Sequence, residues 1–219
     1  MKILAADTAL GACSVAVLDG GRVLAHRFEA MERGHAEALA PMVEDAMRAS
    51  GIAFADIDRL AVTTGPGTFT GQRVGLAFMR GLRVALKKPL TGITTLEAMC
   101  AAAMEEAGTD YAVAIHDARR GEAYLAVTSK ADVLIVPEIL LLEGAAARIA
   151  KVIPPGASLA VCGTAAETIA AMLPQTRATT IRQPDALWIA RLAAVAPEPS
   201  EAPHPLYLRA PDAKLPASA

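Results

Sequence analysis

The stretch GPGTFTGQRVG, from Gly65 to Gly75, decides the fold expected for this chain. It follows a β-like run and opens a helical pattern, so it is expected to join a strand to a helix. Gly65 and Gly67 flank a proline that fixes the turn, and Thr70 can cap the helix. Gly71 and Gly75 lie four residues apart, which lets another backbone approach that helix face closely. The segment is either a tight loop feeding a closely packed helix or a set of free amides that holds an anion.

Strand-like and helical patterns extend from this loop in both directions. A meander of three β-like runs opens the chain, because the Asp19-Gly20-Gly21 turn supplies the positive φ that a tight hairpin needs. Helical and β-like runs then alternate as α-β-α-β-α. The β-like runs are 2–7, 13–18, 22–28, 59–63 and 90–93, and the helical runs are 34–50, 72–86 and 95–107.

The second half repeats this plan, with β-like runs at 111–117, 122–128 and 133–136. Helical runs follow at 143–151, 165–173 and 184–195, with a β-like run at 158–162 between the first two. Two halves that begin with hairpins and continue into crossovers predict a duplicated α/β architecture, with domains at 1–106 and 107–219. The prolines from Pro197 onward, which include Pro211 and Pro216, predict an extended tail along the surface.

Composition and charge exclude several classes of protein. Of the 219 residues, 53% are hydrophobic, but no run reaches the roughly 20 apolar residues of a membrane helix, and Asp7 interrupts the short apolar start. We therefore expect a cytoplasmic protein without a membrane span. The net charge of -2 argues against holding RNA by bulk electrostatics. Three cysteines without a C-x-x-C pair and four dispersed histidines indicate buried thiols and no metal site.

Motifs in the same order along the whole chain resemble those of the TsaB family, also called YeaZ. They are LAADT at 4–8, His35 with Leu39 and Pro41, AVTTGPGTFTGQRVG at 61–75 with LTGITTLEA at 90–98, DARRGEAY at 117–124 and PLYLR at 205–209. The resemblance implies the fold of actin, Hsp70 and sugar kinases (the ASKHA fold), with two related α/β domains. It also implies a role in making N6-threonylcarbamoyladenosine next to the tRNA anticodon.

The partners implied by the resemblance are TsaD, a paralogue that does the chemistry, and the small ATPase TsaE. The chain is expected to be a non-catalytic scaffold or activator that forms a heterodimer with TsaD and supports TsaE binding. No cofactor of its own is expected, because the complex uses ATP and threonylcarbamoyl-adenylate through the partners. We expect tRNA to be reached only via the complex, and a homodimer of the isolated chain stays open.

The chemical motifs of the TsaD paralogue are changed in this chain. Thr95 and Met99 stand where two histidines would hold a metal, and neither side chain suits a metal of that kind. Both phosphate hairpins have lost glycines, and the glycine-rich turn of the second domain keeps a single glycine, so side chains would occupy the approach of a nucleotide. We therefore expect no enzyme activity from this chain by itself. The degenerate nucleotide positions are Asp7, Thr8, Asp117 and Gly163.

Several polar residues each have two interpretations. Asp7 and Asp117 would hold magnesium in an active relative, but each closes a strand, where capping of the turn is the commoner role. His35 is a ligand or base, or else a residue that caps an amphipathic helix or lies on its surface. Arg119 and Arg120 contact an anion or RNA, or else are solvated turn residues. In each case the structural role is the preferred hypothesis.

Two helices of the first domain carry more apolar and small residues than one buried stripe requires. One face then packs on the sheet and the surplus face on a partner, as the resemblance implies. The expected interface residues are His35, Leu39, Met42, Val43, Ala46, Met47, Gly71, Gly75, Leu76, Phe78, Met79 and Leu82. Auxiliary RNA contacts are expected at Arg73, Arg80, Arg83, Lys87, Arg119 and Arg120.

Other functions are weighed against the scaffold. A kinase-like phosphotransferase of the same fold would have to bind nucleotide tightly. A protease needs a metal pair or an activated nucleophile, and the sequence contains neither H-E-x-x-H nor G-x-S-x-G. A direct tRNA-binding module would rest on the basic side of the second helix, although such charges commonly form only a solvated face.

Overall fold

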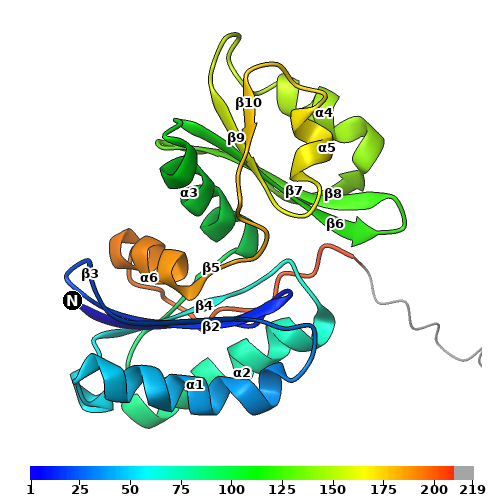
Figure 1. Cartoon of the computed structure of the whole chain (residues 1–219). Coiled ribbons are helices and arrows are strands. Elements are labelled where there is room, and N and C mark those ends of the chain that lie inside the picture. The colour runs from blue at the N-terminus through cyan, green and yellow to red at the C-terminus, as the bar shows by residue number, and fades with distance from the viewer. Residues whose placement is uncertain (210–219) are drawn as a thin grey trace, which may run out of the picture.

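Residues 1–209, which the computed structural model describes, build two five-stranded mixed sheets, one in each half of the chain (Figure 1). The first sheet has the order β3-β2-β1-β4-β5 and the second the order β10-β9-β6-β7-β8. In each, an antiparallel meander of three strands continues into parallel strands reached by crossovers. The duplicated α/β architecture is therefore confirmed. Pro211 and Pro216 of the expected tail lie outside the described residues.

The strands agree closely with the expected runs, and β10 adds one that was not expected. The first sheet contains β1 (Lys2–Asp7), β2 (Ala12–Asp19), β3 (Arg22–Ala30), β4 (Arg59–Thr63) and β5 (Leu90–Ile93). The second contains β6 (Tyr111–Arg119), β7 (Glu122–Ser129), β8 (Val133–Leu141), β9 (Leu159–Cys162) and β10 (Thr176–Ala178). At the first hairpin Gly20 and Gly21 have φ of 54° and 88°, as the turn requires.

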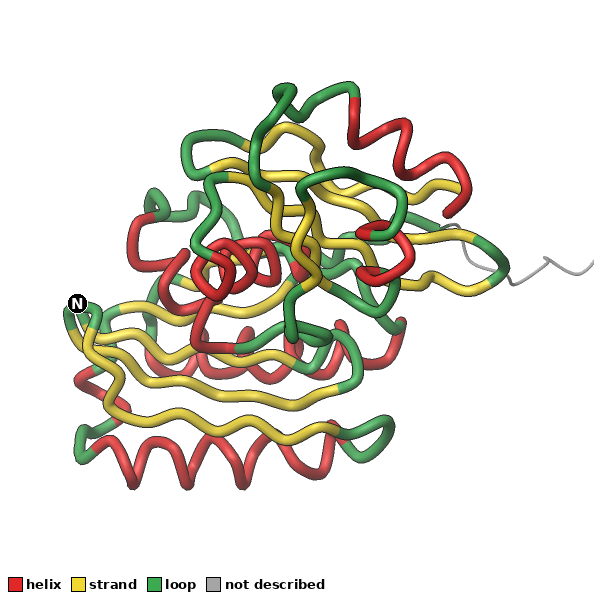
Figure 2. Tube along the Cα trace, turned by 45° about the horizontal axis from the view of Figure 1, so that its top comes forward, coloured by secondary structure: helices red, strands yellow, loops and turns green. Residues whose placement is uncertain are grey.

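The helices occupy the expected places, although α2 begins earlier, α5 and α6 are shorter, and the short η1 was not expected. They are α1 (His35–Ser50), η1 (Phe54–Asp56), α2 (Phe69–Leu86), α3 (Thr95–Ala107), α4 (Leu142–Ala150), α5 (Ala166–Ala170) and α6 (Ala186–Val195). Helices α1 and α2 pack on the outer face of the first sheet, and the turned view of Figure 2 shows that sheet lying over them. Gly51 and Gly108 end α1 and α3 in the left-handed conformation, as expected.

Two helices each pack on the sheet formed by the other half of the chain, which corrects the expected domain boundaries. Helix α3 lies within 1–106 except for its last residue, but Leu96 and Met99 pack with Ala112 and Ala114 of the second sheet. Helix α6 lies within 107–219, but it packs its buried alanines and Ile189 on the first sheet. Both helices therefore lie between the two sheets in Figure 1. A division at residue 106 separates each helix from its packing partners, because apolar burial follows the sheets and not the chain order.

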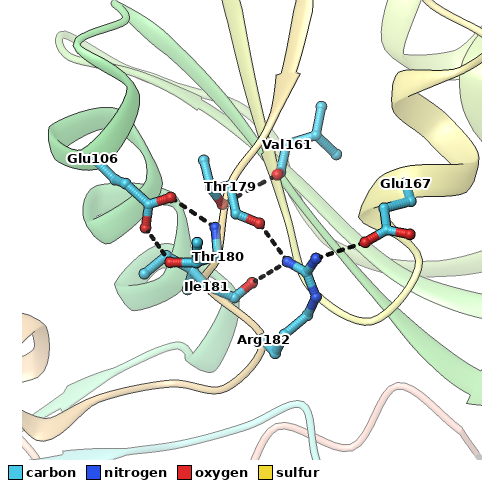
Figure 3. A network of polar contacts seen from close by, with 7 residues as sticks. All are labelled: Glu106, Val161, Glu167, Thr179, Thr180, Ile181 and Arg182. Carbon is cyan, nitrogen blue, oxygen red and sulfur yellow. Dashed lines mark hydrogen bonds and ion pairs between the residues drawn. The ribbon is translucent and has the colours of Figure 1, made fainter.

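A network of polar contacts holds the segment that leads from β10 back to the first domain (Figure 3). The backbone N–H and hydroxyl of Thr180 each donate to a carboxylate oxygen of Glu106 at 2.7 Å. Arg182 donates to Glu167 at 3.0 Å and to the carbonyl of Thr179. These bonds tie α3, α5 and the crossing segment together, so they determine where the next residues meet the first domain.

The glycine-rich segment packs against the turn between β1 and β2. A Cβ added at Gly67 would lie 2.2 Å from the carbonyl oxygen of Ala9, and one at Gly71 would lie 2.2 Å from that of Thr8. The N–H of Thr68 donates to the Ala9 carbonyl at 2.8 Å. The tight-loop interpretation is confirmed, and the glycines are needed because a backbone occupies the space of their missing side chains.

The N-terminal cap of α2 was expected two residues too late in the chain, at Thr70 and not at Thr68. The helix begins at Phe69, and Thr68 accepts a hydrogen bond from the Gly71 N–H at 3.0 Å. Thr70 therefore lies inside the first turn of the helix and not at its cap.

The remaining sequence-based expectations on composition concern the cysteines and the membrane. Cys13, Cys100 and Cys162 are free and buried, as expected. Among the helices of residues 1–209, none combines the length and the apolar character that a membrane crossing requires.

Replacing Gly71 by Ala should destabilise the protein by about 1–3 kcal/mol, since its Cβ must displace the Thr8 backbone. Gly81 lies in the same helix with no atom within 4 Å of an added Cβ, so Gly81→Ala should stabilise by up to about 1 kcal/mol. Urea denaturation of both variants and of the wild type measures the two changes in the free energy of unfolding. Equal effects of the two substitutions would contradict the close-packing role.

Candidate functional site

The carboxyl ends of β1, β4 and β5 meet at one edge of the first sheet, the place where α/β folds bind ligands. Asp7 ends β1 there and is fully buried. Its Oδ1 accepts from the Thr63 hydroxyl at 2.5 Å and from the Ala9 N–H at 3.1 Å, while Oδ2 has no hydrogen-bond partner among residues 1–209. Burial raises the pKa of the Asp7 carboxyl from 3.8 to about 7.

The polar groups of the first hairpin are used by the chain's own side chains. The Ala9 N–H donates to Asp7, and the Gly11 N–H donates to Oε1 of Gln183 at 2.8 Å. The Thr8 hydroxyl donates to the Gly71 carbonyl at 2.7 Å. A phosphate held by such a hairpin would need free backbone amides, and these two are already paired.

The second hairpin is exposed and capped by its own aspartate. Oδ1 of Asp117 accepts from the Arg119 N–H at 2.7 Å, and the Asp117 N–H donates to the Thr164 hydroxyl at 2.8 Å. Arg119 and Arg120 have φ of 66° and 59°, which shapes the turn. The turn-capping hypothesis is thus confirmed for Asp117. For Asp7 the Ala9 bond also fits it, although its complete burial was not expected.

Gly163 serves packing in the second domain. It has a φ of 99°, and an added Cβ would lie 2.0 Å from the carbonyl oxygen of Ile115. The residue therefore lets the turn after β9 contact the neighbouring strand β6.

Thr95 and Met99, which were expected to replace the paralogue's histidines, lie in the interior. Thr95 is fully buried at the start of α3, and its N–H donates to the Gly65 carbonyl at 2.8 Å. Met99 is fully buried and packs with Leu10 and Cys100. Met99 fills space between the two domains, which is the ordinary role of an apolar side chain in a core. The buried hydroxyl of Thr95 has no hydrogen-bond partner among residues 1–209.

Two polar residues were missed by sequence reasoning: His116 of β6 and Gln183 of the crossing segment. His116 is 8% exposed, its Nδ1 has no partner within residues 1–209, and burial lowers its pKa to about 4. Side chains alternate between the two faces of a strand, so His116 lies on the same face as Ala112 and Ala114. This pattern could have predicted that His116 is buried. Gln183 could not be found this way, because its contact with Gly11 spans 172 residues of sequence.

Most of the expected interface residues are buried inside the chain, which corrects that prediction. They pack on the first sheet because it presents more apolar surface than one narrow stripe can cover. The buried residues are His35, Leu39, Val43, Ala46, Met47, Gly71, Gly75, Leu76 and Met79. Met42, Phe78 and Leu82 are half-buried and pack against the same cluster.

Two of these corrections have specific causes. Nε2 of His35 donates to the Leu10 carbonyl at 2.9 Å, so this residue joins α1 to the first hairpin and is neither a surface residue nor exposed to a partner. A Cβ at Gly75 would lie 2.7 Å from the Thr8 hydroxyl oxygen, so a large side chain there would disturb the subunit itself.

The outward face of α2 is exposed, unlike the buried residues of the expected interface. Ala77, Gly81 and Ala85 are exposed at a four-residue spacing, and Val84 beside them is 73% exposed. This spacing places small side chains in one stripe along the helix.

The expected RNA-contact residues divide into two groups. Arg73 donates to the hydroxyl of Tyr207 at 2.7 Å and lies 3.6 Å from the ring centre of Phe69. Arg80 donates to the Pro203 carbonyl. Both therefore hold residues 203–207 against α2. Arg83, Lys87, Arg119 and Arg120 lie on the surface.

A family model described as "TsaD: tRNA N6-adenosine threonylcarbamoyltransferase" matches residues 23–198. The chain belongs to the TsaD family. Its resemblance to the TsaB branch is confirmed by the tRNA threonylcarbamoyladenosine biosynthesis protein TsaB of Escherichia coli (strain K12), 44% identical over 126 residues. That match covers 58% of this chain and 54% of the relative. The chain thus spans about half the length of the curated TsaB relatives it matches, with 52% for the protein of Haemophilus influenzae.

Solved structures agree with this family and with the predicted ASKHA fold. One described as an uncharacterized protein with similarity to peptidase YEAZ from Pseudomonas aeruginosa is 30% identical, with a TM-score of 0.79. It covers 95% of this chain and 99% of that chain. Component A of (R)-2-hydroxyglutaryl-CoA dehydratase from Acidaminococcus fermentans shares the fold alone, at 9% identity and a TM-score of 0.53, covering 89% and 99% of the two chains.

The buried Asp7 predicts a pH-dependent stability. Because its folded pKa is raised from 3.8 to about 7, the folded state holds the proton in this window and the unfolded state releases it. The contribution of Asp7 to stability should therefore fall as the pH rises through the window and level off above it. Buried His116, whose pKa is lowered from 6.5 to about 4, acts in the opposite direction, so the Asp7 effect is measured against a variant and not from the wild type alone. Asp7→Asn cannot ionise, so its stability relative to wild type should increase by on the order of 4 kcal/mol across the window.

Denaturant titrations at a series of pH values measure this difference. Thr63→Val removes the hydrogen bond that lowers the Asp7 pKa, so it should move the upper end of the window to higher pH. A stability difference between Asp7→Asn and wild type that is the same at every pH would disprove the assignment.

Proposed function

We propose that this chain is a non-catalytic subunit of the machinery that makes threonylcarbamoyladenosine in tRNA, and that it pairs with TsaD. The observation that carries the proposal is the internal use of the nucleotide edge, where Asp7 and Gln183 bind the hairpin amides. Thr95 and Met99, at the positions where the resemblance implies the metal pair, are both buried. A chain whose own side chains occupy both positions supports a scaffold better than a phosphotransferase.

In this proposal the chemistry belongs to the partners, in the cytoplasm. TsaD and TsaE use ATP and threonylcarbamoyl-adenylate, and tRNA meets this chain only within the complex. The relatives named TsaB and the family model named for the transferase support the pathway.

The outward face of α2 is the surface we propose for TsaD. Its small residues Ala77, Gly81 and Ala85 let a second helix approach closely, and Val84 offers apolar area. The proposed interface residues therefore differ from those expected from the sequence, which are buried. The contact is still one between helices, as the sequence predicted.

The isolated chain should neither hydrolyse ATP nor modify tRNA. Adding TsaD and TsaE from the same organism, with ATP, tRNA and threonylcarbamoyl-adenylate as the donor of the transferred group, should produce threonylcarbamoyladenosine. Omitting this chain should abolish or strongly reduce the yield. Nucleoside analysis of digested tRNA, with a phosphate-release assay, makes the measurement. Turnover by the chain without TsaD would defeat the proposal.

Gly81→Arg should abolish association with TsaD while the subunit stays folded, because a large cation would be buried at an apolar helix contact. An added Cβ at Gly81 has open space around it, and the same holds for Gly144 in α4. Gly144→Arg is therefore the matched control and should still bind. Size-exclusion chromatography with TsaD and a thermal melt report binding and folding. A folded Gly81→Arg subunit that still forms the heterodimer would place the interface elsewhere.

A further inference from the structure

The segment that contains α2 carries only positive charge. From Arg59 to Leu96 the sequence has six lysines and arginines and no aspartate or glutamate, although the whole chain has a net charge of -2. Five of these cations belong to α2 and the two residues after it, namely Arg73, Arg80, Arg83, Lys87 and Lys88. None of the five forms an ion pair with a carboxylate in the part of the chain that the structure describes. Their charge is therefore not neutralised locally.

Four of these cations lie along one flank of α2, called here the basic flank. Arg73, Arg80 and Lys87 follow one another at seven-residue intervals, or about two helical turns, and Arg83 lies about one turn before Lys87. Arg83 and Lys87 are exposed. At about 100° per residue, the basic flank lies roughly 100° around the helix from the stripe of small residues proposed for TsaD, so the two surfaces are distinct.

An exposed aromatic pair lies at the first turn of the basic flank. Phe69 and Tyr207 are 56% and 43% exposed, and their rings are stacked with centres 5.7 Å apart. The Arg73 guanidinium lies 3.6 Å from the Phe69 ring centre and 5.7 Å from that of Tyr207. A Tyr207 ring on the opposite face of Phe69 would be farther from Arg73 than from Phe69, yet both distances are 5.7 Å. Arg73 and Tyr207 thus lie on one side of Phe69, and neither covers its other face.

These two features together fit single-stranded nucleic acid better than an acidic protein. Cations in a row contact successive phosphates, and bases of any sequence stack on an aromatic ring. An acidic peptide would also pair with the cations, but it offers no flat ring system for the uncovered face of Phe69. The charge and the aromatic face lie on the same helix flank, as a nucleotide chain requires.

We propose that the basic flank binds a single-stranded segment of tRNA, an inference that rests on the proposed function and gives the tRNA contact of this chain within the complex. Arg83 and Lys87 contact phosphates, and one base stacks on the uncovered face of Phe69. Arg73 donates to the Tyr207 hydroxyl and Arg80 to the Pro203 carbonyl, so these two arginines hold the tail beside the flank and position the aromatic pair.

Fluorescence anisotropy of labelled tRNA with the heterodimer of this chain and TsaD, over a series of salt concentrations, tests the proposal. Arg83→Gln combined with Lys87→Gln should raise the Kd about tenfold at about 0.1 M salt and reduce the slope of log Kd against log salt by roughly one to two. Phe69→Leu removes a ring and no charge, so it should raise the Kd about tenfold with the slope unchanged. Phe69→Tyr keeps the ring and should bind as wild type does.

Arg22→Gln combined with Arg177→Gln is the matched control, since both are exposed cations on β3 and β10, away from α2. It should change the Kd by less than about twofold. Size-exclusion chromatography and a thermal melt, made before tRNA is added, should show a folded heterodimer for every variant.

Equal weakening by the control pair, an unchanged salt slope for the double variant on α2, or wild-type binding by Phe69→Leu would overturn the proposal. Loss of TsaD or TsaE association by the double variant, with tRNA affinity kept, would assign the basic flank to a protein and overturn it as well. A wild-type chain that forms no heterodimer would contradict the proposed function at the chromatography step, and this inference with it.

Discussion

The close contact between the glycine-rich segment and the first hairpin is the constraint on which the rest of the structure depends. Gly67 and Gly71 leave room for the backbone of Thr8 and Ala9, at distances that no side chain would permit. The contact sets α2 against the carboxyl end of β1, and His35 fastens α1 to the same hairpin. Because both helices cover the outer face of the first sheet, this contact helps to determine how they pack on that face.

The same contact has a consequence for chemistry. In the same hairpin, the Ala9 N–H donates to Asp7 and the Gly11 N–H donates to Gln183 of the crossing segment, so neither amide is free. Gln183 reaches it because Glu106 and Glu167 hold the residues just before it (Figure 3). An edge of the sheet that could receive an anion is thus filled by the protein's own polar groups. This arrangement supports a subunit that acts through its surface.

The exchange of α3 and α6 makes the two halves one packed unit. Each helix covers the sheet of the other half, so apolar burial joins the domains in addition to the connecting chain. A pocket between α3, α6 and the β7–β8 turn is a product of that exchange, because its walls come from both domains. The outward face of α2 takes no part in it and stays available for another protein.

Local patterns in the sequence determined the order and type of the elements, since alternation, helical periodicity and glycine turns depend on neighbouring residues. They also indicated the family and the packing role of the glycines. Tertiary structure alone decided which helix faces are buried, since Leu39 and Met79 look the same in sequence whether they meet a sheet or a partner. It also decided the exchange of α6 and the Gln183 contact, because both join residues far apart in the chain.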